Sequence, residues 1–81
     1  MTASEVIEGL REMEARKAHG GRTTLQQRFY RAFPGKRFAL STVKRMITVF
    51  NKLSEEERDQ YVDEDPEHPW DEIYRRLAKK S

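Results

Sequence analysis

The hydrophobic residues near the amino terminus follow the three- and four-residue spacing of an amphipathic helix. Thr2 and Glu5 are spaced as a capping box, in which two residues satisfy each other's free backbone N–H groups at a helix start. Gly20-Gly21 supplies a stop signal, because glycine commonly ends helices. The pattern predicts a helix over roughly residues 3–19. Its buried face consists of Val6, Ile7, Leu10 and Met13.

A second helix is predicted over residues 24–33. Thr23 or Thr24 can cap its start, and each has a glutamine three residues further on. Pro34-Gly35 is a turn sequence and ends the helix. The buried face of this helix consists of Leu25, Phe29, Ala32 and Phe33.

The clearest amphipathic pattern lies over residues 42–53, after a cap at Ser41 or Thr42. Together with the preceding helix it forms a helix-turn-helix-like pair. The turn between Ala32 and Ser41 is longer than the three or four residues of that motif, which a variant arrangement would tolerate. The apolar stripe consists of Val43, Met46, Ile47, Phe50 and Leu53.

The carboxyl-terminal third predicts two more helices. Ser54 and Glu57 form a second capping box, which opens a short acidic helix ending near Val62. Pro66 or Pro69 can occupy the first turn of a last helix, where the missing N–H costs nothing. That helix has an apolar face of Trp70, Ile73, Tyr74 and Leu77. The sequence thus predicts one all-α domain over residues 1–81, a small bundle of four to five short helices without strands.

The amino-acid composition excludes several classes of function for this protein. Charged residues make up 37% of the chain and hydrophobic residues 36%, and cysteine is absent. The absence of cysteine excludes disulfides and thiolate chemistry, and His19 and His68 lack the spacing of metal ligands. We therefore expect no enzyme activity, no cofactor and no metal. No apolar run is long enough to span a membrane and no signal peptide is apparent. These features favour an intracellular protein of the cytoplasm, nucleoid or nucleus.

Charge is distributed very unevenly along the chain. Residues 15–53 hold ten basic and no acidic residues, whereas residues 54–74 hold ten acidic residues and one basic residue, Arg58. The formal net charge of +2 conceals this segregation. Two interpretations follow: the two stretches pair within the fold, or the basic stretch is a surface for a polyanion.

The helix over residues 42–53 favours the second interpretation. When its apolar stripe faces inward, polar and basic side chains at i, i+1, i+4, i+7 and i+8 share the outward face. Arg, Thr and Asn read base edges in the major groove, and Lys binds phosphate. We therefore predict a small DNA-binding protein, a transcriptional regulator or accessory factor, whose partner is duplex DNA. The expected base contacts are Arg45, Thr48 and Asn51, and the expected phosphate contacts are Arg28, Arg31, Lys36, Arg37, Lys44 and Lys52.

One segment also resembles a known family. Residues 49–61, VFNKLSEEERDQY, resemble the corner between the second and third helices of HMG-box domains, which bend DNA from the minor groove. The family's third helix is long and basic, whereas this chain turns acidic and reaches Pro66 and Pro69. The resemblance covers 13 of 81 residues and implies a shared helix corner, without a transfer of function.

The acidic segment 54–74 supports a rival hypothesis. It could bind a basic protein partner as an inhibitor or adaptor, or it could fold back and screen the basic face. A small DNA binder usually gains specificity by dimerising, so we also expect a homodimer. The first helix is the expected interface between the two copies.

Overall fold

The computed structural model describes residues 1–18 and 24–78, which form five helices and no strand beyond an isolated bridge between Thr2 and Pro69. This confirms the predicted all-α fold class. The predicted stop at Gly20-Gly21 lies outside the described residues. None of the helices in the described ranges has the length and apolar content that crossing a bilayer requires. The helices are α1 (Ala3–Ala18), α2 (Leu25–Ala32), α3 (Leu40–Lys52), α4 (Glu55–Asp63) and α5 (Trp70–Ala78).

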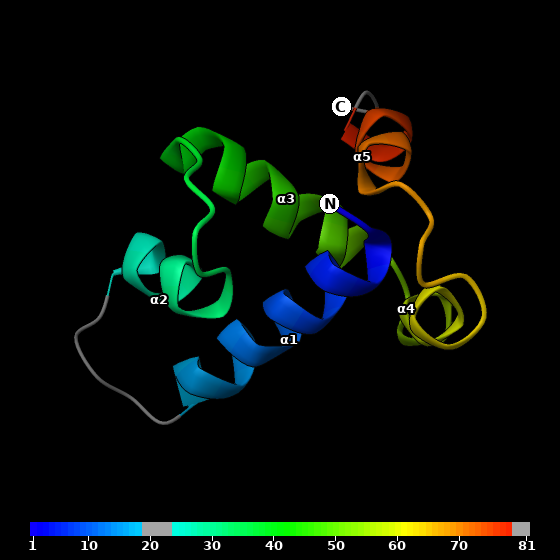
Figure 1. The fold of residues 1–81 in the computed structure, drawn as a ribbon, viewed down its shortest axis with the longest axis horizontal. Coiled ribbons are helices and arrows are strands. Elements are labelled where there is room, and N and C mark those ends of the chain that lie inside the picture. Colours follow the sequence, from blue (N-terminus) through cyan, green and yellow to red (C-terminus); the bar gives the residue numbers. More distant parts are fainter. Residues whose placement is uncertain (19–23, 79–81) are drawn as a thin grey trace.

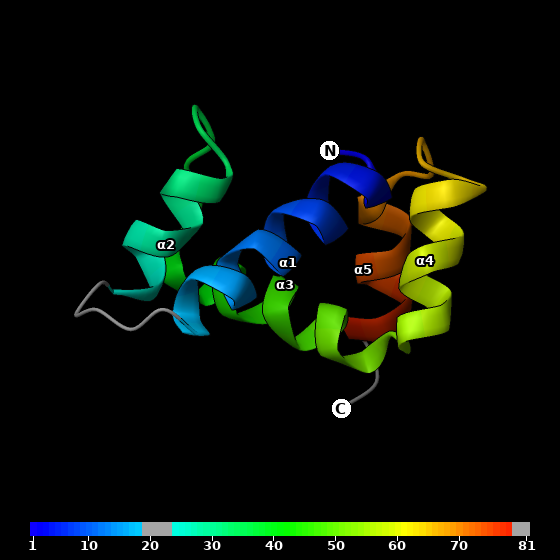
Figure 2. The ribbon, with the colours of Figure 1, turned by 90° about the horizontal axis from the view of Figure 1, so that it is seen from below.

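Helix α1 lies at the centre of the bundle and contacts all four other helices (Figure 1). Helices α2 and α4 lie at opposite ends of the molecule, and α5 lies beside α3 (Figures 1 and 2). The predicted apolar face of α1 is buried in this core, with Val6 and Ile7 fully inaccessible and Leu10 and Met13 almost so. The apolar face of α1 is therefore used inside the fold, and the expectation that the first helix forms a dimer interface stays a prediction for its outer face.

The helix starts follow the predicted capping residues at α2 and α4. Thr24 accepts a hydrogen bond from the Gln27 backbone N–H at 3.2 Å and donates its own N–H to the Gln27 side chain at 3.0 Å. Ser54 and Glu57 form the same reciprocal pair at α4, with both distances 3.1 Å. At α1, the Thr2 hydroxyl accepts from the Glu5 N–H at 3.2 Å.

The start of α3 differs from the prediction. The helix begins at Leu40, and its N-cap is Ala39, which has an extended backbone and no side-chain hydrogen bond. Ser41 and Thr42 thus lie inside the first turn and do not cap the helix. The physical reason is that the extended backbone of Ala39 directs the chain into the helix two residues before the predicted start.

Helix α3 packs against α5, α1 and α2. Val49 is therefore almost inaccessible, although the single-stripe pattern had left it outside the core, and Ile47 is only partly buried. The rest of the predicted stripe is in the core, including Val43 and Phe50. A helix with several neighbours has a wider buried arc than one amphipathic stripe predicts.

Three backbone hydrogen bonds join the amino terminus to residues 66–70, and one of them runs from the Ser4 N–H to the Pro66 carbonyl at 3.3 Å. The Ala3 N–H donates to the His68 carbonyl at 2.7 Å, and the Trp70 N–H donates to the Met1 carbonyl at 3.1 Å. Trp70 is 3% exposed, which confirms it as a core residue. These hydrogen bonds hold the amino terminus against the segment that leads into α5. Helix α3 lies at one side of the molecule (Figure 1).

Candidate nucleic-acid interface

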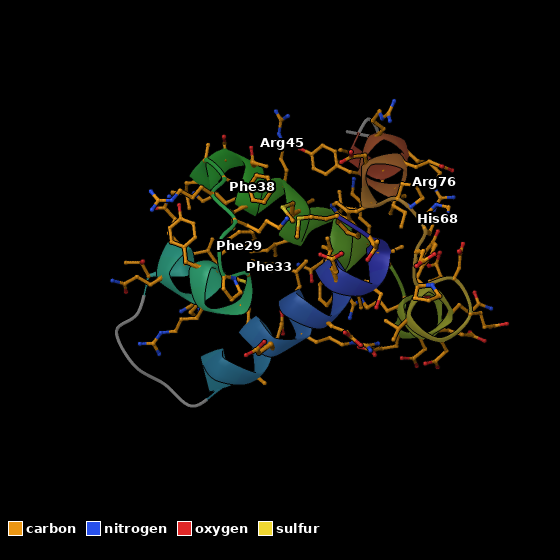
Figure 3. All side chains as sticks on the ribbon, in the orientation of Figure 1. Phe29, Phe33, Phe38, Arg45, His68 and Arg76 are labelled. Atoms are coloured by element: carbon orange, nitrogen blue, oxygen red, sulfur yellow. The ribbon has the colours of Figure 1, made fainter. Side chains whose placement is uncertain are left out.

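The outward face of α3 is exposed as predicted. Because α1 and α5 cover the remaining sides of the helix, the open arc is restricted to one stripe. Figure 3 shows Arg45 projecting from α3 away from the body of the protein. The exposed side chains of this stripe, which we call the α3 face, are Lys44, Arg45, Thr48, Asn51 and Lys52.

Two members of the α3 face already have partners within the protein. The Lys52 ammonium donates a hydrogen bond to the Leu77 carbonyl at 2.9 Å and so caps the last turn of α5. The Thr48 hydroxyl donates to the Lys44 carbonyl at 3.0 Å. A phosphate contact by Lys52 would compete with its bond to α5. Thr48 keeps its oxygen lone pairs and its methyl group for an external contact.

The remaining predicted cations do not all join the α3 face. Arg28 is half-buried and lines a depression with Glu14, between α1, α2 and α3. Lys36 borders another depression, together with acidic residues of α1 that include Glu5 and Glu8. Arg31 and Arg37 are exposed on α2 and on the turn that follows it. The structure therefore divides the predicted site between the α3 face and the α2 end of the molecule.

The basic and acidic stretches are not extensively paired. Within the described residues, Arg31, Arg37, Lys44 and Arg45 make no ion pair. The acids of α4 are instead engaged from α1 and from α4 itself. The Arg11 guanidinium, for example, lies 2.7 Å from Asp59 Oδ1. The unpaired cations on α2, α3 and the turn between them produce a positive potential at this end of the molecule. The amino-terminal end of the α3 dipole adds to this potential, since no acidic side chain in the first turn of α3 offsets it.

The Glu57 carboxylate at the start of α4 has a perturbed acidity. The backbone N–H of Ser54 donates a hydrogen bond to it, and the Ser54 hydroxyl adds a second favourable interaction, so the pKa of Glu57 is lowered from 4.5. Arg76 contributes a weaker electrostatic effect in the same direction. These interactions belong to the helix cap, and they identify no catalytic group.

Two exposed hydrophobic side chains near the basic end were missed from the sequence. Tyr30 and Leu40 are each 40% exposed. Tyr30 follows the core residue Phe29 directly and therefore points away from the buried stripe of α2. A large aromatic residue off the stripe and followed by Arg31 was the available signal.

The pairing of α2 with α3 does not establish a helix-turn-helix. The two helices contact each other, and residues 33–39 connect them. A helix-turn-helix arrangement of this pair is not confirmed. In the described part of the chain, no group of three His, Asp or Glu side chains is placed to hold a metal ion.

Comparison of this chain with known protein families, curated proteins and solved structures yields no match. The resemblance of residues 49–61 to an HMG-box corner therefore stays local to the junction of α3 and α4. The α3 face and its surroundings are the basis for assigning a function.

Proposed function

We propose that this chain is a small DNA-binding protein, a transcriptional regulator or accessory factor, which places α3 against duplex DNA. The observation that carries the proposal is the α3 face, where Lys44 and Arg45 are exposed without an ion pair in the described residues. Cations that need not leave an internal partner can neutralise phosphates and release counterions at little cost.

The dimensions and chemistry of α3 suit a major groove. Its 13 residues span about 20 Å, and a groove about 12 Å wide admits an α-helix. Arg45 can donate two hydrogen bonds to guanine, and Asn51 can pair with adenine. Thr48 offers its methyl group to thymine, because its hydroxyl proton is bonded to Lys44. Lys44 and Arg31 supply charge for phosphates on either side.

The rival function is protein binding through the acidic segment 54–74. Helix α4 has no fully buried residue, and Asp63 and Glu64 at its end are exposed. This leaves an acidic surface opposite the basic end of the molecule (Figure 1). The rival and the DNA hypothesis differ in which charged pair is required for binding.

Fluorescence anisotropy with a labelled random-sequence duplex tests the proposal. With six engaged phosphates, affinity falls about a thousandfold or more between about 50 and 200 mM salt. The combined change Lys44→Gln and Arg45→Gln should weaken binding at least about tenfold and reduce the salt slope by about 0.9, because Lys44 contacts a phosphate and Arg45 contacts a base. The matched control is Arg75→Gln with Arg76→Gln, which removes the same charge from exposed positions of α5.

The proposal fails if the unmodified protein does not bind the duplex at low salt. It also fails if both double variants weaken binding equally, because net charge rather than the α3 face would then explain the affinity. The rival is supported if Asp63→Lys with Glu64→Lys abolishes capture of a protein partner while the α3 variants have no effect.

A further inference from the structure

A shallow depression lies at the turn between α2 and α3, outside the α3 face. Its volume is about 310 Å³, and it is lined by Tyr30, Gly35, Lys36 and Arg37. Lys36 and Arg37 were predicted to contact phosphates, and the structure places both of them here, while Lys36 also borders a hollow lined by Thr42 and Met46 of α3. The depression therefore has its own composition of two cations and one aromatic hydroxyl.

The turn that forms the depression is held in place by the core. The Lys36 N–H donates to the Phe33 carbonyl at 3.2 Å. Gly35 has a φ of 82°, a left-handed conformation that favours glycine. Beneath the turn, the Phe29 ring stacks on Phe33 at 4.5 Å and meets the edge of Phe38 at 5.7 Å (Figure 3). The backbone that carries the lining groups is thus held in place before any ligand binds.

The lining groups are available to an anion. Tyr30 is 40% exposed, and its hydroxyl makes no hydrogen bond to the part of the protein that the structure describes. Arg37 is exposed and has no ion pair there. Lys36 is also exposed, but it borders a second depression, which is lined by Glu5 and Glu8 of α1. Arg37 therefore supplies the charge that no nearby acid offsets, and Lys36 adds to it.

We infer that this turn binds a phosphate of the DNA backbone, held by Arg37 and Lys36 and by a hydrogen bond from the Tyr30 hydroxyl. The inference rests on the proposed function. Arg, Lys and Tyr are residues that contact backbone phosphates in protein–DNA complexes. A phosphate held at the turn provides a second fixed point beside the α3 face. It thereby sets the orientation of α3 along the groove.

The test uses the full chain and a labelled duplex of about 20 base pairs, titrated at several salt concentrations. Lys36→Gln with Arg37→Gln should weaken binding about tenfold and lower the salt slope by about 0.9, the value for one phosphate contact. The single variant Arg37→Lys should have the same salt slope as the unmodified protein, because the positive charge is retained. Tyr30→Phe should weaken binding about fivefold and leave the slope unchanged, because the hydroxyl that is lost donates a hydrogen bond but carries no charge.

The controls separate this inference from the proposed function and from misfolding. The lining side chains are exposed, so helical content by circular dichroism and the melting temperature should match those of the unmodified protein. A loss of structure in Lys36→Gln with Arg37→Gln would shift the test to Tyr30→Phe alone. If the unmodified protein binds steeply and the turn variants bind identically to it, the inference is overturned and the proposed function stands. If the unmodified protein does not bind, both are overturned.

Discussion

Helices α2 and α4 form an informative pair, because both are short, both pack against α1 and both begin with the same capping box. They differ in what attaches them to the rest of the protein. Helix α2 buries Phe29 completely, and Phe33 at its end packs against α1 where Gly9 leaves room for the ring. Helix α4 has no fully buried residue.

The attachment of α4 combines the half-buried Tyr61 and Val62, which pack against the core, with polar contacts that centre on Arg58. Its guanidinium donates two hydrogen bonds to the Phe50 carbonyl, at 3.2 and 2.8 Å, and lies 3.8 Å from the centre of the Phe50 ring. It also pairs with Glu55 at 3.0 Å. Arg11 on α1 adds the contact with Asp59.

The comparison shows that a helix start signal does not determine how the helix is held. Because aromatic packing holds α2, its exposed Arg31 remains free of ion pairs within the described residues. Helix α4 uses part of its acidic charge on Arg11 and Arg58. The unequal availability of charge at the two ends of the molecule follows from this difference in attachment.

The largest effect is expected from removing the aromatic anchor of α2. Phe29→Ala should cost about 3–5 kcal/mol of unfolding free energy, because it leaves a cavity between three aromatic neighbours. Urea denaturation measures this loss. Tyr30→Ala, at the adjacent exposed position, is the control and should cost about 1 kcal/mol or less. Equal losses at the two positions would contradict an apolar attachment of α2.

A smaller effect is expected from removing the polar anchor of α4. Arg58→Met keeps the aliphatic stem but loses the charged hydrogen bonds to Phe50, at a cost of about 2 kcal/mol. Arg58→Lys should be intermediate, because an ammonium lacks the planar fork that donates twice to one carbonyl. Urea denaturation monitored by circular dichroism measures both variants. A stability of Arg58→Met equal to that of the unmodified protein would show that α4 is held by other contacts.

The close approach of α1 and α2 gives a third test. In most helices glycine to alanine is stabilising, but a Cβ at Gly9 would overlap with the Phe33 ring. Phe33 is stacked on Phe29 and cannot move freely. The overpacking cost exceeds the gain in helix propensity, so Gly9→Ala should lose about 1 kcal/mol net. Adding Phe33→Leu should recover part of this loss in a double-mutant cycle, and simple additivity would refute the contact.

The smallest effect concerns the capping box of α4 and depends on pH. The pKa of Glu57 is lowered in the folded protein, chiefly by the hydrogen bond from the Ser54 N–H, so the ionised form stabilises the fold. This contribution is complete above the ordinary value of 4.5 and disappears as the pH falls through the lowered pKa. Thermal melts between about pH 3 and pH 6 should therefore show a shallower acid loss in Glu57→Gln than in Glu56→Gln. Identical pH profiles for the two variants would contradict the assignment.

Much of the fold was predictable because its signals are local. The Thr24 and Ser54 caps depend on residues three positions apart, and the buried faces of α1 and α2 depend on helical spacing. The exposure of the α3 face was also predictable, since it is the complement of an apolar stripe. Interactions within one turn of helix need no knowledge of the neighbours.

The remaining features depend on which helices become neighbours. The burial of Val49, the bond from Lys52 to Leu77 and the attachment of Arg58 to Phe50 all join residues of different helices. The placement of Lys36 and Arg37 beside Tyr30 of α2 has the same origin. By itself the sequence determined that four to five short helices form and that charge divides along the chain. Only the tertiary structure decided which charges are used internally and which remain available, because that depends on the groups that packing brings within reach.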